Sequence, residues 1–182
     1  MIIAICGEPG SGQSSVGKEL AKRLGYRFYS IGDMRGKMAR ERGMTIEELN
    51  RLGEREDFTD KEVDDFQEKL GKKEDNFVVV GRTSAHFIPH SFKVLLKAEL
   101  GVRAQRVFQD SVNREDESYS SAGEAGKAIT ERMESDKRRY RKHYGINPFD
   151  EKLYDIVVDT TRIGINEVVD RIMDKMREAG KI

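Results

Sequence analysis

Gly7-Glu8-Pro9-Gly10-Ser11-Gly12-Gln13-Ser14-Ser15 is the stretch of this chain that decides its fold. Its glycines let backbone N–H groups converge on an anion and let the chain approach that anion closely. The stretch follows the phosphate-loop pattern G-x-x-x-x-G-K-[ST] except at the charged position, where Gln13 stands in place of lysine. It therefore predicts a loop that binds phosphate groups without the usual cation.

The residues on either side of this loop have the order of a strand, a loop and a helix. Ile2–Cys6 is a short apolar run that predicts a buried strand. After the loop, Val16, Leu20 and Leu24 fall at i, i+4 and i+8 on one face of a helix, and Gly25 supplies a helix stop. The dipole and the free N–H groups at the start of such a helix favour a bound phosphate.

The loop is therefore the predicted site for a nucleotide cofactor. Ser14 has the position and the chemistry of a hydroxyl group that binds Mg²⁺. The alternative is a glycine-rich turn with no ligand. The predicted phosphate-binding residues are Gly7, Gly10, Ser11, Gly12, Gln13, Ser14 and Ser15.

The composition is that of a single cytoplasmic domain. A chain of 182 residues suits one domain with a sizeable core. The formal net charge is zero, so there is no general attraction to nucleic acid or membrane, and no apolar run approaches the ~20 residues of a membrane span. Cys6 is the only cysteine, which excludes an intrachain disulfide, and the N-terminus lacks the basic region of a signal peptide. The charged fraction of 36% is common in heat-adapted proteins.

Apolar runs and helical patterns alternate along the chain, which predicts an α/β fold with a parallel sheet. The expected strands are Ile2–Cys6, Arg27–Tyr29, Phe77–Val80, Phe92–Lys97 and Ile156–Val158. Thr45-x-x-Glu48 and Thr59-x-x-Glu62 both have the pattern of a helix capping box, and we expect the second helix to end at Gly71. Residues 124–143 predict one or two basic helices, and an apolar stripe around Val168 and Ile172 predicts a final helix packed on the core.

Three further groups of residues point to the same cleft. Ser30 and Asp33 follow the second expected strand, where ligands gather in open α/β sheets; the alternative is a turn and a helix N-cap. Arg82 follows the third expected strand, from which its guanidinium group could bind phosphate, although it could also be a surface arginine.

The third group is Arg132-x-x-x-Asp136-x-x-Arg139, with His143 four residues further on. On a helix these positions share one face, where two arginines beside a carboxylate suit a phosphate clamp. A surface ladder of salt bridges is the alternative.

With these residues the chain resembles a P-loop nucleoside monophosphate kinase, most closely a cytidylate kinase of the archaeal type, over essentially its whole length. The resemblance implies a sheet in the order 2-3-1-4-5 and a single P-loop kinase domain over residues 1–182. Within that domain it implies a monophosphate-binding insertion at about residues 33–75 and a helical lid at about residues 114–145. The motifs that carry it are the loop Gly7–Ser15, Ser30-Ile31-Gly32-Asp33, Gly81-Arg82, the Arg132/Asp136/Arg139 helix and residues 154–160.

The resemblance also implies a reaction, in which ATP and Mg²⁺ phosphorylate CMP or dCMP. Arg82, Arg132, Asp136 and Arg139 are the implied catalytic residues. Arg82 would bind the acceptor phosphate, Arg132 and Arg139 would close over the transferred group, and Asp136 would orient these two arginines. The implied acceptor-binding residues are Ser30, Asp33, Arg35 and Arg82. We expect only nucleotides as partners, without nucleic acid or membrane, and a monomer or weak dimer.

The sequence departs from the family at three positions. Gln13 replaces the loop lysine, Gly36 stands where relatives usually have an arginine for the acceptor phosphate, and Val80 replaces an acidic residue. Arg35 is next to Gly36, but a shift of one residue turns a helical side chain by about 100°. The departures leave open a weakened kinase or a catalytically silent relative that binds nucleotide in a regulatory or partner-binding role.

Overall fold

The computed structural model describes residues 1–45, 48–49, 51–52, 58–111 and 119–182, and the side chains of residues 58–60 are not described. In this part of the chain five parallel strands form one sheet in the order β2-β3-β1-β4-β5. The predicted fold class and strand order are therefore confirmed. The strands are β1 (Ile2–Gly7), β2 (Arg27–Ser30), β3 (Phe77–Val80), β4 (Phe92–Lys97) and β5 (Ile156–Asp159).

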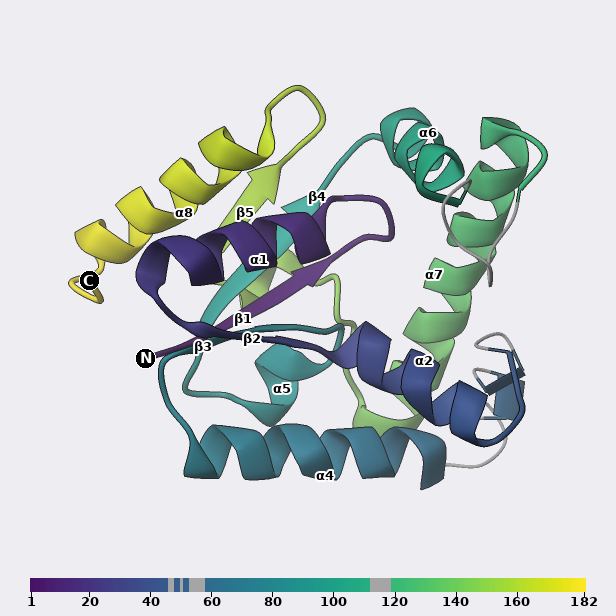
Figure 1. Cartoon of the computed structure of the whole chain (residues 1–182), viewed down its shortest axis with the longest axis horizontal. Helices are drawn as coiled ribbons and strands as arrows, with labels where there is room; N and C mark the ends of the chain where they lie inside the picture. The colour runs from purple at the N-terminus through teal and green to yellow at the C-terminus, as the bar shows by residue number, and fades with distance from the viewer. Residues whose placement is uncertain (46–47, 50, 53–57, 112–118) are drawn as a thin grey trace.

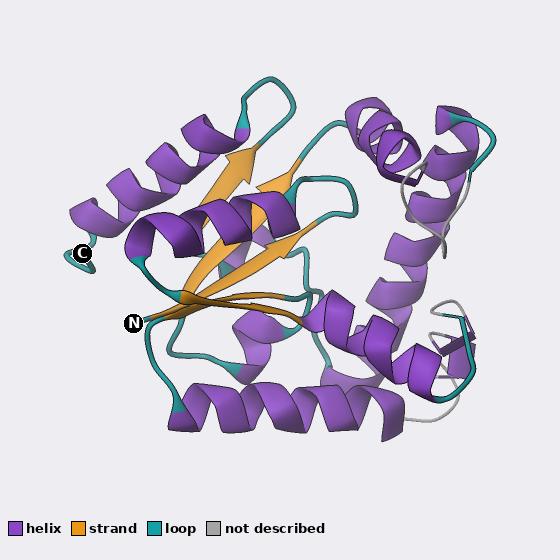
Figure 2. Ribbon diagram, viewed as in Figure 1, coloured by secondary structure: helices purple, strands orange, loops and turns teal. Residues whose placement is uncertain are grey.

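The central strand β1 is apolar throughout because helices cover both faces of the sheet (Figures 1 and 2). On one face, α1 (Gln13–Leu24) and α8 (Ile165–Glu178) pack on a core that includes Ile3, Ile5 and Val94. The predicted apolar stripe of α8 is buried there. On the other face lie α2 (Ile31–Glu41), α4 (Phe58–Lys73) and the short α5 (Ser84–Phe87).

Two further helices stand beside the carboxyl ends of the strands (Figure 1). These are α6 (Leu100–Ser111) and α7 (Ala122–Tyr144), which pack against each other. The basic segment predicted as one or two helices is the single helix α7. Ser121 caps its start by accepting a hydrogen bond from the Glu124 N–H, and Gly145 ends it in the left-handed conformation. A short 3₁₀ turn, Glu151–Leu153, then leads into β5.

The structure tests the helix starts and the helix end that were predicted between the second and third strands. Thr45 and Glu48 exchange the expected pair of side-chain hydrogen bonds, at 3.1 and 2.8 Å. The Thr59 side chain lies outside the described part of the structure. Gly71 does not end α4, which continues to Lys73. A Cβ atom at Gly71 would lie 2.9 Å from Ile88, so this glycine serves close packing of α4 against the α5 region rather than termination.

Candidate functional site

The phosphate loop takes the shape that its glycines permit. Gly10 and Gly12 have φ angles of 83° and 88°, in the left-handed region that other residues avoid. A Cβ atom at Gly10 would lie 2.7 Å from the backbone oxygen of Arg103, so α6 touches the loop directly. A Cβ atom at Gly7 would lie 3.2 Å from the Leu96 carbonyl oxygen. The loop is therefore closely packed against β4 and α6.

The carbonyl groups of the loop are held from the side of α6 and β5. Arg103 and Arg106 donate to the carbonyl oxygens of Pro9 and Gly10, both at 3.4 Å. The Thr160 hydroxyl, at the end of β5, donates to the Ser11 carbonyl at 2.9 Å. Arg106 also binds Thr160, at 2.8 Å to its carbonyl oxygen. These bonds give the three loop carbonyl groups donors from α6 and β5, whereas the first N–H groups of α1 have no intrahelical acceptor.

Arg103 connects several parts of this region and is itself buried. Its Nε donates to the Ala98 carbonyl at 2.8 Å and lies 3.3 Å from a carboxylate oxygen of Glu8. Its Nη1 also reaches the sulfur of Met133 on α7 at 3.3 Å. The sequence analysis assigned no role to Arg103, Arg106 or Thr160. The available signal was two arginines three residues apart on the helix that follows β4, at the carboxyl edge of the sheet.

The predicted phosphate-binding side chains lie at the start of α1. The Ser14 and Ser15 residues are exposed, whereas Ser11 is buried. Within the described part of the chain, the Ser11 Oγ and Gln13 Oε1 atoms are buried and have no hydrogen-bond partner. Lys18 lies over the ring of Phe28, 5.8 Å from its centre, so it does not replace a loop lysine.

A second group of site residues surrounds a buried carboxylate. Asp136, on α7, is 4% exposed and lies between two guanidinium groups. The Nε of Arg82 is 2.5 Å from one carboxylate oxygen, and Arg139 donates to the other at 2.9 Å. Arg139 also donates to the Tyr140 hydroxyl at 2.9 Å. The association of Asp136 with Arg139 that the spacing predicts is therefore present, and it is buried rather than a ladder on the surface. The other guanidinium group at this carboxylate belongs to Arg82, which the sequence analysis placed in the same cleft but did not pair with Asp136.

Arg132 and His143 lie on the same helix as Asp136, as predicted from the spacing, and both are half-buried. Arg132 is one turn before the carboxylate, and His143 is one turn after Arg139. The helix therefore carries all four predicted positions along the side that meets the Arg82 segment.

Strand register brings the Arg82 segment to the base of the phosphate loop. Ile5 pairs with Val80, and the Gly81 N–H donates to the Ile5 carbonyl at 3.1 Å. Next along β1, the Cys6 thiol lies 3.7 Å from the Arg82 carbonyl and 3.5 Å from the Pro148 carbonyl. Burial raises the pKa of this thiol to about 11, so it stays protonated and able to donate.

The predicted site residues that follow the second strand, Ser30, Asp33 and Arg35, differ in burial and in role. Ser30 pairs with Val80 in register, so it lies at the same edge as the loop. Its hydroxyl accepts a hydrogen bond from the Asp33 N–H at 3.1 Å, and it is thus the N-cap of α2. Asp33 is exposed, whereas Arg35 is buried. The N-cap alternative for this turn is therefore realised by Ser30.

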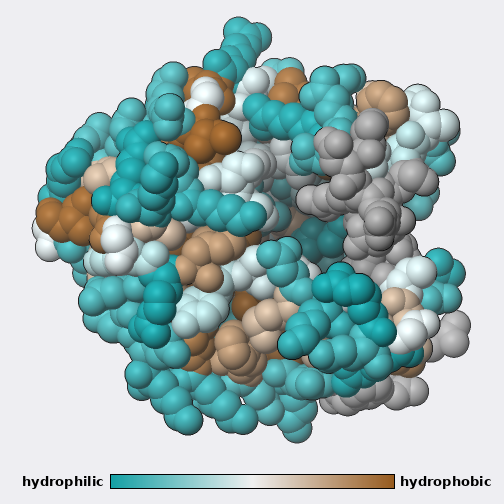
Figure 3. All heavy atoms as spheres, viewed as in Figure 1, coloured by the Kyte–Doolittle hydropathy of each residue, from teal (hydrophilic) through white to brown (hydrophobic). Residues whose placement is uncertain are grey.

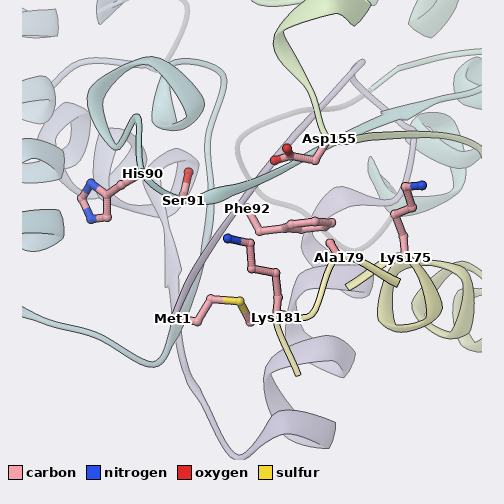
Figure 4. A pocket seen from close by; sticks show the side chains of 8 residues that line it. All are labelled: Met1, His90, Ser91, Phe92, Asp155, Lys175, Ala179 and Lys181. Carbon is pink, nitrogen blue, oxygen red and sulfur yellow. The ribbon is translucent and has the colours of Figure 1, made fainter. Parts of the chain in front are cut away.

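Elsewhere the surface carries mainly hydrophilic side chains with scattered apolar patches on the face shown in Figure 3. A hollow lined by Met1, Phe92, Asp155 and Lys175 lies at the opposite edge of the sheet, where β1 and β4 begin (Figure 4). It contains none of the predicted site residues. Among the described residues, no helix has the length and apolar character needed to cross a membrane.

Comparison with known proteins shows that this sequence is similar to those of kinases. The sequence model of the cytidylate kinase-like family matches residues 2–162. The cytidylate kinase of Methanocella arvoryzae is 35% identical over 182 residues, covering 98% of this chain and 100% of that protein. The cytidylate kinase of Methanothermobacter thermautotrophicus is 39% identical over 162 residues, covering 89% of this chain and 96% of that protein.

Solved structures support the fold alone, because their sequence identities are low. An uncharacterised protein from Eubacterium ventriosum has a TM-score of 0.72 at 19% identity, covering 97% of this chain and 98% of that one. Shikimate kinase from Acinetobacter baumannii, solved with shikimate, has a TM-score of 0.62 at 16% identity, covering 98% of this chain and 93% of that one.

Proposed function

The chain belongs to the cytidylate kinase-like family, and from this premise we propose that it transfers the γ-phosphoryl group of ATP to CMP or dCMP with Mg²⁺. The observation that carries the proposal is the position of Arg82, Asp136 and Arg139. They meet at the carboxyl edge of the sheet, beside the strand that leads into the phosphate loop. Phosphoryl transfer needs this combination of a donor cradle and cations around the transferred group.

The residues of the phosphate loop and the start of α1, which form the donor side of the site, fit a nucleoside triphosphate and its metal ion. The loop presents N–H groups at the start of α1, and the exposed Ser14 hydroxyl is an oxygen ligand of the kind that Mg²⁺ prefers. The buried Ser11 hydroxyl, which has no partner among the described residues, is a further possible donor to a phosphate in this cradle. A bound Mg²⁺ would offset charge on the phosphate oxygens.

The acceptor side uses cations that Asp136 holds in place. Arg82 binds the phosphate of the monophosphate, and Arg132 and Arg139 neutralise charge on the equatorial oxygens of the transferred group. Asp136 keeps Arg82 and Arg139 within one site before the nucleotides arrive. Ser30, Asp33 and Arg35 lie on the side of the nucleoside, at the start of α2. In this proposal α7 is the main helix of the lid.

Gln13 weakens the reaction without abolishing it. Its side-chain amide can donate a hydrogen bond to a phosphate but carries no charge. Loss of one preorganised donor to the transition state costs about 3 kcal/mol, or roughly a hundredfold in rate. Gly36 and Val80 extend this weakening to the acceptor side. A Cβ atom at Gly36 would lie 3.5 Å from the Arg40 guanidinium, so another arginine lies close to that position.

The experiment is a coupled assay for ADP formation with ATP, Mg²⁺ and a panel of nucleoside monophosphates. We expect CMP and dCMP to be the best acceptors. An absence of ADP formation above background with every acceptor would refute the kinase proposal. Calorimetric binding of ATP together with that absence would instead favour the catalytically silent nucleotide-binding protein.

A further inference from the structure

Four buried polar side chains and one half-buried tyrosine join three elements behind the acceptor side of the site. It consists of Asp64, Gln67, Thr83, Ser84 and Tyr144. Asp64 and Gln67 belong to α4, Thr83 and Ser84 directly follow Arg82, and Tyr144 is the last residue of α7. We call these five residues the Asp64 network. The predicted site residues do not include any of them.

Asp64 is the centre of this network. It is 6% exposed, and one of its carboxylate oxygens accepts hydrogen bonds from the Gln67 amide at 3.1 Å and the Thr83 hydroxyl at 3.2 Å. Its other carboxylate oxygen accepts a hydrogen bond from the Tyr144 hydroxyl. The two oxygens therefore face different elements, with the Arg82 segment on one side and α7 on the other.

Gln67 makes two further hydrogen bonds to the segment that follows Arg82. It is fully buried, and its carbonyl oxygen accepts a hydrogen bond from the Ser84 hydroxyl at 2.6 Å, while its amide donates to Thr83 at 3.1 Å. A Cβ atom at Gly81 would lie 2.7 Å from Ile31, so the chain just before Arg82 is pressed against α2. The backbone is therefore held on both sides of Arg82, by Ile31 before it and by the Asp64 network after it.

The Asp64 network and the Arg82–Asp136 ion pair form two parallel links between the same elements. Each connects α7 with residues 82–84, through Asp136 in one case and Tyr144 in the other. Asp136 and Tyr144 lie just over two turns of α7 apart, and they reach residues 82–84 directly and through Asp64, respectively. A movement of α7 that changes one link therefore also changes the other.

We propose that Asp64 is a positioning residue that couples α4, the Arg82 segment and the end of α7, so that binding of the monophosphate sets the position of the lid helix. This inference rests on the proposed kinase function and deepens it. Asp64 acts through Thr83 on the direction of Arg82 and through Tyr144 on α7. A buried polar network of this kind specifies one arrangement of its elements, whereas apolar side chains would leave several arrangements close in free energy.

The test removes single hydroxyl groups from the network. In Tyr144→Phe the ring keeps its contacts with Phe87 and Tyr140, whose ring centres lie 5.2 and 6.1 Å away, but the bond to Asp64 is lost. We expect the KM for CMP to rise roughly tenfold and the KM for ATP to change less than twofold. The lost bond would no longer hold α7 and the Arg82 segment in the arrangement that binds CMP, and one hydrogen bond to a charged group has an effect of about this size.

Tyr29→Phe is the matched control. Tyr29 donates to Glu74, just beyond the C-terminal end of α4, at 2.8 Å, so the variant also removes one tyrosine–carboxylate hydrogen bond. A role in stability alone predicts that both variants lower the melting temperature and leave the KM for CMP unchanged. The coupling predicts a raised KM for CMP in Tyr144→Phe only.

A second pair of variants keeps the inference testable if Tyr144→Phe folds poorly. Thr83→Val removes the hydroxyl group at nearly constant volume, and Thr83→Ser retains it. We expect Thr83→Val to raise the KM for CMP roughly tenfold and Thr83→Ser to restore it. Because Thr83 and Tyr144 act through the same carboxylate, the double variant should show about the tenfold effect of either single variant rather than a hundredfold effect.

The outcomes separate the two proposals. A wild-type chain that phosphorylates no monophosphate contradicts the proposed function, whatever the variants do. An active wild-type chain whose Tyr144→Phe and Thr83→Val variants keep the KM for CMP overturns the coupling and leaves the kinase function standing. A multiplicative double variant also overturns it, since the two hydroxyl groups would then act independently.

Discussion

Two pairs of arginines lie at the carboxyl edge of the sheet, and they differ in what their guanidinium groups bind. Arg103 and Arg106, on α6, donate to backbone carbonyl groups of the phosphate loop. Arg82 and Arg139 instead share the carboxylate of Asp136. Both arginines of the first pair therefore hold backbone oxygens of the loop, whereas the second pair meets at one carboxylate.

The difference indicates which pair can meet a substrate. If a guanidinium group moves away from a buried carbonyl oxygen, that oxygen loses its hydrogen-bond donor. This loss costs free energy and loosens the loop. A guanidinium group that shares a carboxylate can turn toward a phosphate, which offers the same bidentate, charge-assisted geometry. We therefore assign Arg103 and Arg106 to the shape of the donor loop, and Arg82 and Arg139 to the transferred group.

The largest effect is expected from Arg82→Ala. Loss of a cation that binds the acceptor phosphate should lower kcat/KM for CMP by about a thousandfold, as for other preorganised groups that stabilise a transition state. Steady-state kinetics with CMP measures it. Arg27→Ala is the matched control, because Arg27 is exposed and its ion pair with Glu74, at 2.7 Å, lies away from the site. Equal losses in both variants would contradict the assignment of Arg82.

The next effect is expected from Gln13→Lys. A lysine at the start of α1 adds a full charge next to the phosphates, in a loop whose carbonyl groups are already held in place. We expect kcat to rise by roughly a hundredfold, the inverse of losing one donor. The same acceptor assay measures it. Unchanged turnover would show that Gln13 does not limit the reaction. The substitutions at Gly36 and Val80 would then be the next candidates for the limiting ones.

Part of the candidate site could be predicted from the sequence alone. The glycine pattern identified the loop, and the spacing of Arg132, Asp136 and Arg139 placed them on one helix face, because both are local features. The same spacing predicted Arg139 as a partner of Asp136, but it could not predict Arg82, which comes from a distant part of the chain. Strand positions followed from apolar runs, since both faces of the sheet are covered.

Other contacts could not be predicted because they join distant parts of the chain. Thr160 meets Ser11 across 149 positions, and Tyr144 meets Asp64 across 80. Charged or polar residues on a helix are usually solvated, so Arg103 and Asp64 give no local signal of burial. The prediction that Gly71 ends α4 is wrong for a related reason. A glycine near a helix end usually signals termination, but here a tertiary contact with Ile88 decides its role.

A smaller effect is expected from Arg103→Ala, and it should fall mainly on stability. Arg103 is 7% exposed and serves the carbonyl groups of Ala98 and Pro9 as well as Glu8. Its removal should lower the free energy of unfolding by about 2–3 kcal/mol, because buried acceptors lose their donor. Urea denaturation measures this change. We expect kcat to fall far less than in Arg82→Ala, and a reversed order would break the distinction between the two pairs.

The smallest effect is expected from Thr160→Val, which sharpens the account of the donor loop. Thr160 is 3% exposed, and its hydroxyl both donates to the Ser11 carbonyl and accepts from Arg106. Its loss should reduce the free energy of unfolding by about 1 kcal/mol, the net value of a typical hydrogen bond. Because the Ser11 carbonyl would then be free to turn, the KM for ATP should rise while the KM for CMP stays constant. Thr160→Ser retains the hydroxyl and should behave as the wild type. A rise in the KM for CMP alone would show that this threonine supports the acceptor side, and the division between the arginine pairs would have to be redrawn.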